Sequence, residues 1–126
     1  MLDKYQCNYN TLLMWIWAHL HYISFGDYIR EKGYNSVAIY GMGDLGNLLY
    51  DELEKDSIKV SFVVDNNKGV FCNCPVYSLD DEIPNVDFVL ITVESQSGLI
   101  ADCLEKKGLH GISFQQFLCY ATRLSL

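Results

Sequence analysis

The sequence has 126 residues, a formal net charge of −7 and 50% apolar residues. This length fits one domain with a single core, and the apolar share excludes a disordered chain. The acidic excess disfavours nucleic acid and anionic membranes as partners, because both are polyanions. A single nucleotide held by main-chain amides is still compatible with this charge.

The cysteines and the first residues bear on the cellular compartment. Five cysteines form no pattern typical of a secreted disulfide framework. The segment 1–6 is not followed by the short apolar run and small-residue cleavage site of a signal peptide. We therefore expect a cytoplasmic protein. Cys72 and Cys74 form a C-x-C, but a metal site needs two more ligands and no Cys/His pair lies nearby. We predict two ordinary loop thiols and no metal.

Residues 8–25 form an unusual segment that is rich in apolar and aromatic side chains and contains two histidines. The segment is too short to span a membrane, which takes about 20 apolar residues. We predict a helix with Asn10 or Thr11 as its N-cap. Its apolar residues surround the helix, so it must be covered on more than one side. Two interpretations stay open: a homo-oligomer formed through this helix, or packing across the sheet of its own domain.

A short second helix is expected at residues 25–32. Ser24 and Asp27 have the spacing of a capping box, and Gly33 is placed to end the helix. Within this helix Tyr28 and Lys32 form Y-x-x-x-K, the spacing of the catalytic pair in short-chain dehydrogenases. In that family the pair follows the later strands, whereas here it precedes the first. We therefore assign it no catalytic role.

The most informative stretch is a strand, a glycine turn and a helix. Residues 36–40 predict a buried strand, residues 41–46 read G-x-G-x-x-G, and residues 44–55 predict a helix. In this context Gly41 permits the tight turn, Gly43 lets a diphosphate approach the main chain, and Gly46 lets the helix pack closely on the strand. The first helical amides and the positive end of the helix dipole favour a phosphate.

A second strand at residues 59–64 ends in Asp65, nineteen residues after Gly46. This spacing is typical of the acid that binds the ribose hydroxyls. We expect Asp65 and Asn66 to hold the ribose with Lys68 close by. A carboxylate there repels a 2′-phosphate, which favours NAD over NADP. The alternative is a tight turn and a solvated strand-end aspartate with no ligand.

Strands and helices continue to alternate through the rest of the chain. The predicted elements are a brief strand at 76–77, a helical turn at 79–82 capped by Ser78, a strand at 86–93, a helix at 95–107, a strand at 112–113 and a helix at 114–120. This alternation predicts an α/β protein with a Rossmann-like open parallel sheet of order 3-2-1-4-5. We place an N-terminal helical extension at residues 1–33 and the nucleotide-binding domain at residues 34–126.

The ligand is expected where the strand order reverses, at the carboxyl ends of the first and fourth strands. Thr92 and Ser95 carry hydroxyls that can donate to it, although both can instead cap the next helix. No catalytic residue is assigned. The predicted cofactor-binding residues are Gly41, Met42, Gly43, Asp44, Leu45, Gly46, Asp65, Asn66, Lys68, Thr92 and Val93.

Four segments together resemble a group of bacterial polysaccharide-biosynthesis modules. They are Ile-Tyr-Gly-x-Gly-x-x-Gly at 39–46, Phe-Val-Val-Asp-Asn-Asn at 62–67, Cys-Pro-Val-Tyr-Ser-Leu-Asp-Asp at 74–81 and Asp-Phe-Val-Leu-Ile-Thr-Val at 87–93. The group includes the N-terminal Rossmann modules of sugar acetyltransferases and the nucleotide-binding domains of membrane nucleotide-sugar dehydratases and epimerases. CoA-binding domains are similar too. The resemblance covers about residues 34–118 and implies that the glycine motif and Asp65 bind NAD or a nucleotide-sugar.

The catalytic parts of those enzymes lie in further domains, for which this sequence shows no counterpart. We therefore expect an accessory or sensing subunit that binds NAD or a nucleotide-sugar, with CoA as another candidate ligand, in bacterial surface-polysaccharide biosynthesis. Whether it catalyses a reaction stays open. One alternative is an epimerase- or dehydratase-type enzyme whose site is completed by oligomerisation. The other is an interaction protein that has lost the ligand and uses its aromatic N-terminal helix as the working surface.

Overall fold

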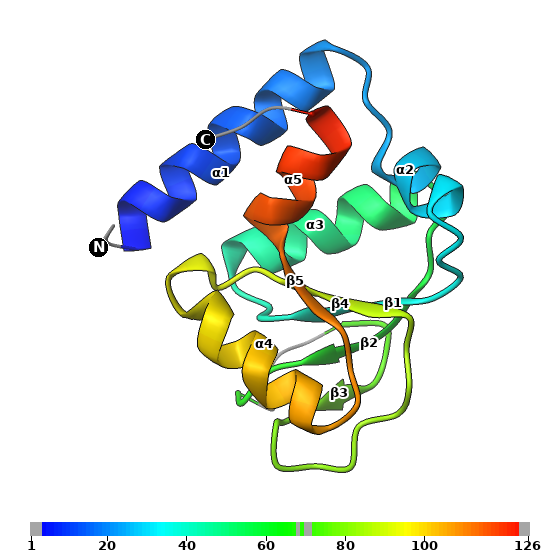
Figure 1. Cartoon of the computed structure of the whole chain (residues 1–126), viewed down its shortest axis with the longest axis vertical. Helices are drawn as coiled ribbons and strands as arrows, with labels where there is room; N and C mark the ends of the chain where they lie inside the picture. Colours follow the sequence, from blue (N-terminus) through cyan, green and yellow to red (C-terminus); the bar gives the residue numbers. More distant parts are fainter. Residues whose placement is uncertain (1–3, 68, 70–71, 124–126) are drawn as a thin grey trace.

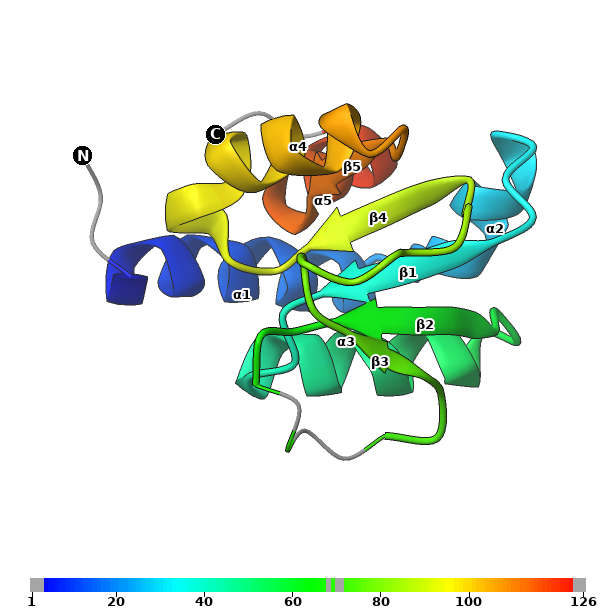
Figure 2. The ribbon, with the colours of Figure 1, turned by 90° about the horizontal axis from the view of Figure 1, so that it is seen from below.

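One sheet of five parallel strands forms the centre of the molecule, in the order β3-β2-β1-β4-β5 (Figure 2). The computed structural model describes residues 4–67, 69 and 72–123. The strands are β1 (Val37–Tyr40), β2 (Val60–Val64), β3 (Val76–Tyr77), β4 (Phe88–Ile91) and β5 (Gly111–Ser113). This arrangement confirms the predicted Rossmann-like α/β fold with an N-terminal helical extension.

The central strand β1 pairs with β2 on one side and with β4 on the other. Tyr40, its last residue, lies opposite Val64 of β2 and Ile91 of β4. All residues of β1 and β4 are buried, which explains their uninterrupted apolar sequence, because helices or loops cover both faces of a parallel sheet. The carboxyl ends of β2, β1 and β4 therefore lie side by side (Figure 2).

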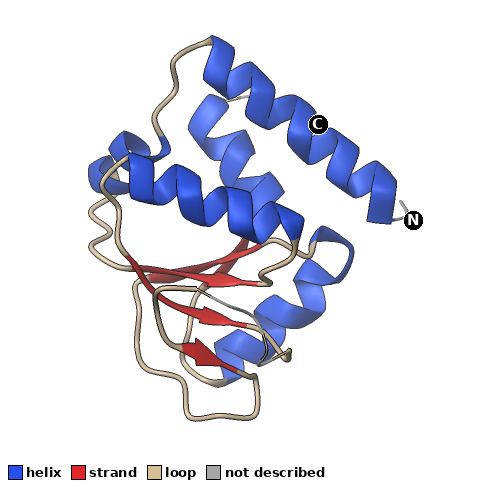
Figure 3. Ribbon diagram, turned by 180° about the vertical axis from the view of Figure 1, so that it is seen from behind, coloured by secondary structure: helices blue, strands red, loops and turns tan. Residues whose placement is uncertain are grey.

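The helices cover the two faces of the sheet unequally (Figures 1 and 3). The helical elements are α1 (Lys4–Leu20), α2 (Phe25–Glu31), α3 (Asp44–Lys55), the 3₁₀ helix η1 (Glu94–Gln96), α4 (Ser97–Lys106) and α5 (Phe114–Thr122). Side chains of α1, α2, α3 and α5 share one core with the first face. The second face packs against α4 and the loop that precedes β4. The N-terminal extension thus contributes directly to the main core.

Helix α1 begins at Lys4, so the prediction of an N-cap at Asn10 or Thr11 is wrong. Thr11 lies inside the helix, and its hydroxyl donates to the Cys7 carbonyl oxygen at 2.9 Å. A hydroxyl that bonds four residues back cannot cap the helix start. The buried face of α1 also extends to Cys7, so packing supports the extra turns.

One face of α1 packs on its own domain, as one of the two interpretations proposed. The Trp15 ring meets Phe114 of α5 edge-on, with ring centroids 4.8 Å apart. The buried residues of α1 are Cys7, Thr11, Met14, Trp15 and Ala18. The opposite face exposes the large apolar side chains Tyr5, Tyr9, Leu12, Leu13, Ile16 and Leu20. A homo-oligomer formed through this exposed face stays a prediction.

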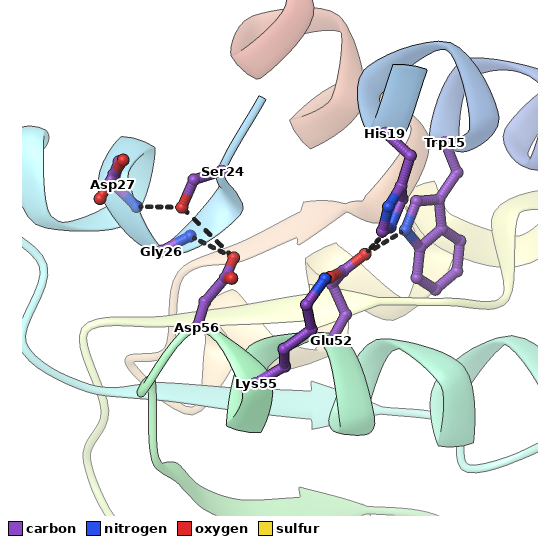
Figure 4. A network of polar contacts seen from close by, with 8 residues as sticks. All are labelled: Trp15, His19, Ser24, Gly26, Asp27, Glu52, Lys55 and Asp56. Atoms are coloured by element: carbon purple, nitrogen blue, oxygen red, sulfur yellow. Dashed lines mark hydrogen bonds and ion pairs between the residues drawn. The ribbon is translucent and has the colours of Figure 1, made fainter. Parts of the chain in front are cut away.

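Polar contacts fasten α1 and α2 to α3 (Figure 4). Trp15 Nε1 donates to Glu52 Oε1 at 2.8 Å, and His19 contacts the same carboxylate. About one turn further along, Asp56 Oδ2 accepts from the Gly26 amide at 3.2 Å and lies 3.4 Å from the Ser24 hydroxyl. The helix that starts at the glycine turn therefore also positions the N-terminal extension.

Two further local predictions have different outcomes. The capping of α2 is confirmed, because Ser24 Oγ accepts from the Asp27 amide at 3.1 Å. Residues 79–82 do not form the predicted helical turn. They form a non-helical turn, in which the Asp81 carboxylate accepts from the Ser78 amide at 2.9 Å. In the described part of the chain, every helix is too short or too polar to cross a lipid bilayer.

The docking of α1 gives a first prediction. Trp15→Ala removes an aromatic ring from the core together with its bond to Glu52, and we expect a loss of about 3–5 kcal/mol in unfolding free energy. Leu13→Ala is the control on the exposed face of the same helix, with an expected change of about 0.5 kcal/mol. Urea unfolding followed by far-ultraviolet circular dichroism measures both. Equal losses in the two variants would show that α1 is not anchored through Trp15.

Candidate functional site

The chain leaves β1 through a tight turn at Gly41. This residue has φ +91°, in the left-handed region that favours glycine. Its amide donates to the Val64 carbonyl oxygen at 2.9 Å, and its own carbonyl oxygen lies 2.9 Å from the Thr92 hydroxyl. A Cβ at Gly41 would lie 2.6 Å from the same hydroxyl. The turn is thus held between β2 and β4, and a side chain has no room there.

Helix α3 starts directly against this turn. A Cβ on Gly46 would lie 1.9 Å from the Gly41 carbonyl oxygen, so only glycine allows this approach. The Asn47 side-chain amide adds two bonds, because it donates to the carbonyl oxygens of Met42 and Gly43 at 2.9 Å each. The loop is therefore ordered by contacts within the protein.

Gly43 is different from the other two glycines of the motif. It is the N-cap residue of α3, and no side chain caps the helix there. Apart from Gly43 itself and its two neighbours in the chain, no atom of the described protein lies within 4 Å of the position that a Cβ would occupy. Packing within the described protein therefore does not require a glycine here. A ligand that approaches the main chain does require one.

Asp65 follows β2 and faces the loop. Its Oδ2 accepts from the Met42 amide at 2.8 Å, and its Oδ1 accepts from the Asn67 amide at 2.8 Å. Each carboxylate oxygen has a second acceptor position. Asp65 can therefore hold the loop and still accept hydrogen bonds from two hydroxyls.

A cavity of about 420 Å³ opens between the glycine loop and the end of β4. This volume is within the range of small-molecule sites, about 300–1,000 Å³. It lies at the point where the strand order reverses, which is where open α/β sheets bind ligands. The lining residues are Cys7, Asn8, Gly41, Gly43, Asp44, Leu45, Gly46, Asp65, Thr92, Val93, Glu94, Ser95 and Gln96.

Eight of the eleven predicted site residues line this cavity, two do not, and one lies outside the described residues. The Met42 side chain is buried in the core, although its amide holds Asp65. Asn66 points to another loop, where its Oδ1 lies 3.4 Å from the Leu79 amide. Lys68 lies outside the described residues. The Thr92 hydroxyl lies within hydrogen-bond distance of the Tyr40 and Gly41 carbonyl oxygens, so it stabilises the glycine loop.

Helix α1 supplies a wall of the cavity that the sequence analysis missed. Cys7 and Asn8 line the cavity, and α1 packs beside η1, which follows β4. These residues lie more than thirty positions before the glycine motif. No local signal identifies such a contact, because it depends on how α1 docks.

Glu94 is an acidic residue of the cavity lining, and one of its carboxylate oxygens has no hydrogen-bond partner among the described residues. Hydrogen bonds from the Ser113 hydroxyl and the Gln115 amide link its carboxylate to the start of α5. Its Oε2 is buried without a hydrogen-bond partner among the described residues. Burial raises the pKa of Glu94, against the smaller, opposite effect of those two bonds. One carboxylate oxygen of Glu94 is therefore buried beside the cavity without a donor among the described residues.

The lining of the cavity is acidic. Asp44, Asp65 and Glu94 contribute carboxylates, and the described lining contains no Lys, Arg or His. The positive end of the α3 dipole and the main-chain amides are the groups that can attract an anion there. A ligand with a high negative charge is therefore disfavoured.

The other candidate groups lie apart from this cavity. Tyr28 and Lys32 line a separate cavity of about 530 Å³, and the Lys32 ammonium lies 5.5 Å from the centre of the Tyr28 ring. The Cys72 and Cys74 sulfurs lie 3.5 Å apart, and burial raises the pKa of Cys74 to about 12. Within the described ranges, no three metal-ligating side chains come together.

Comparison with known proteins adds no relative. No protein-family model, no curated protein and no solved structure matches this chain. The interpretation of the site therefore depends on its own geometry.

The contact between Gly46 and the turn gives a second prediction. We expect Gly46→Ala to lower the unfolding free energy by about 3 kcal/mol, because the new methyl group overlaps the Gly41 carbonyl. Gly98→Ala is the matched control, since it also lies in the first turn of a helix but has no atom within 4 Å of its Cβ position. Chemical denaturation of both variants measures the difference. A mild effect in Gly46→Ala would mean that α3 can shift without cost.

Glu94 gives a third prediction, on stability against pH. A raised pKa in the folded state means that ionisation of Glu94 destabilises the fold, and the cost is fully present above the folded-state pKa. Glu94→Gln removes the charge, and we expect it to stabilise the protein at about pH 7 by roughly 1 kcal/mol.

The gain should disappear below about pH 4, where Glu94 is protonated in both the folded and unfolded states. Urea unfolding at the two pH values measures it. A variant that is less stable than the wild type at both values would mean that the bonds to Ser113 and Gln115 outweigh burial.

Proposed function

We propose that this protein binds a dinucleotide or a nucleotide-sugar at the glycine loop, with NAD as the favoured ligand. The observation that carries the proposal is the open space at Gly43, where nothing in the described protein beyond its chain neighbours lies within 4 Å of a Cβ. The two outer glycines are explained by the fold, and the middle one is explained by a ligand.

The surroundings of Gly43 support this assignment. The loop opens into the cavity at the strand-order reversal, and the first turn of α3 follows it directly. We assign the diphosphate to these amides and the ribose hydroxyls to Asp65. The Asp65 carboxylate repels a 2′-phosphate, which favours NAD over NADP.

The biological role follows from the resemblance of residues 34–118 to polysaccharide-biosynthesis modules. We propose an accessory or sensing subunit in bacterial surface-polysaccharide synthesis. An enzyme completed by oligomerisation and a ligand-free interaction protein are the two competing functions. The exposed apolar face of α1 suits both of them as a contact surface.

A ligand panel supplies the fourth prediction. We expect one or more of NAD⁺, NADP⁺, CoA, UDP and UDP-glucose to raise the melting temperature. At a ligand concentration one hundred times Kd the gain corresponds to about 2.7 kcal/mol. Gly43→Val should abolish this shift, because its side chain enters the space assigned to the diphosphate.

Gly43→Val should remain folded, because its new side chain meets no protein atom at the Cβ. Gly98→Val is the control for an added side chain at a helix start, and it should keep the full shift. Unchanged ligand binding by Gly43→Val would remove the glycine loop from the proposal. The absence of any shift across the panel would favour the interaction protein, whereas a shift accompanied by turnover would favour the enzyme.

A further inference from the structure

Most of the large apolar side chains that the described residues expose lie on one helix, α1. Six of the ten belong to α1, which lies at the edge of the molecule (Figure 1). They fall within an arc of about 100° around the helix axis, because successive residues of a helix are about 100° apart. We call this surface the α1 stripe, and its members are Tyr5, Tyr9, Leu12, Leu13, Ile16 and Leu20.

The α1 stripe is symmetric about the middle of the helix. Its midpoint lies between residues 12 and 13, which are both leucines. Tyr9 and Ile16 lie at equal distances from this point along the sequence, and so do Tyr5 and Leu20. The stripe therefore has the same spacing of large apolar side chains when it is followed from either end.

This spacing suits a second copy of the same chain. A dimer with two-fold symmetry joins the same surface of both copies, so that residue i contacts residue j and j contacts i. We consider two α1 helices that run antiparallel with the symmetry axis at the midpoint of the stripe. Tyr5 of one copy then lies opposite Leu20 of the other. Tyr9 lies opposite Ile16 in the same way. A partner of another sequence would give no reason for this symmetry.

A groove of about 440 Å³ between α1 and α3 borders the stripe. Leu12, Ile16 and Leu20 line it from α1, and Leu48 lines it from α3. Leu48 is 51% exposed, so the apolar surface continues across the groove. The groove therefore offers the second copy a recess for its side chains.

Charge favours a second copy over a lipid surface. The chain has a net charge of −7, but α1 contains no Asp or Glu, so two stripes bring no carboxylates of this helix together. A helix that lies on a membrane is rich in Lys and Arg on its polar face. α1 has one lysine and no arginine. An anionic membrane would in addition repel the acidic chain.

The exposed area of the stripe is sufficient for a specific dimer. The exposed fractions of its six side chains run from 38% for Leu12 to 81% for Tyr5. Because large side chains present roughly 150–250 Å² each when fully exposed, the stripe provides about 600 Å² in each copy. A dimer would bury about 1,200 Å² in total, which exceeds the value of about 1,000 Å² expected of a biological interface.

We propose that this protein forms a homodimer through antiparallel packing of the α1 stripes of two copies. The dimer is closed, because the symmetric contact occupies the stripe of both copies and leaves none for a third. The proposal is independent of the nucleotide site. Its surface lies on the face of α1 opposite to the one that packs on the core.

Sedimentation equilibrium of the wild-type protein over about 1–500 µM tests the proposal, since it gives both the mass and the dissociation constant. We expect the mass to rise from one chain to two and no further. The expected Kd is about 10–100 µM, because the interface lies at the lower end of the size range of specific complexes.

Leu13→Glu should weaken the dimer about tenfold or more, because it places two carboxylates close to the symmetry axis. Leu13 is exposed, so the variant should remain folded by circular dichroism. Leu99→Glu is the matched control, since Leu99 is 72% exposed on α4, outside the stripe. It should keep the wild-type Kd. An unchanged Kd in Leu13→Glu would exclude the stripe as the interface.

Two double variants test the antiparallel direction. Both remove the same outer pair of apolar side chains. Tyr5→Glu with Leu20→Lys places opposite charges against each other in an antiparallel dimer, whereas Tyr5→Lys with Leu20→Lys places like charges there. We expect the first to dimerise about tenfold more tightly than the second. The second variant also lowers the net negative charge, so general repulsion cannot explain its weaker association. Equal affinities would show that the helices do not pair antiparallel.

Wild-type protein that stays monomeric at about 500 µM would overturn the inference. Co-sedimentation of that monomer with phosphatidylcholine vesicles would then assign the stripe to a lipid surface. Association beyond two copies would also overturn it, because a closed dimer leaves no free stripe. The nucleotide site stands or falls separately, by the ligand panel.

Discussion

The contact between Gly46 and the Gly41 carbonyl is the constraint on which the site depends. Because nothing larger than hydrogen fits between them, α3 begins directly above the carboxyl end of β1. The Thr92 hydroxyl holds the same turn from β4. The packing that closes the sheet against its helix therefore also places the first residues of α3 along the cavity. Fold and binding surface share these residues, so one cannot be altered there without the other.

Asp65 adds a connection from β2 to this turn. Its two oxygens accept amides from Met42 and Asn67, so the loop is fixed before a ligand arrives. A preorganised loop reduces the entropy that binding would otherwise cost. The same double role means that an Asp65 variant would disturb loop order and ligand contact together. Gly43, which has no internal contact at its Cβ position, separates the two effects.

Local patterns predicted most of the fold. The bounds of α3 and the order of the sheet followed from apolar periodicity and the glycine motif, because both signals lie within short stretches of chain. The start of α1, the turn at residues 79–82 and the break that separates η1 from α4 did not follow, since tertiary contacts decide them. The wall formed by Cys7 and Asn8 has the same cause.

The cavity shows why the residues of one motif carry different weight. The fold accounts for Gly41 and Gly46, and Asp65 accounts for the order of the loop, so none of these three residues requires a ligand. Gly43 is the glycine of the motif that packing within the described protein leaves unexplained. Glu94 is the first residue of η1 and bonds the start of α5, yet one of its oxygens stays buried without a donor among the described residues. Such a group lowers the stability of the unliganded fold. Because this oxygen is also closed to the cavity, it does not by itself mark a ligand contact, and Gly43 remains the residue of the loop that points to one.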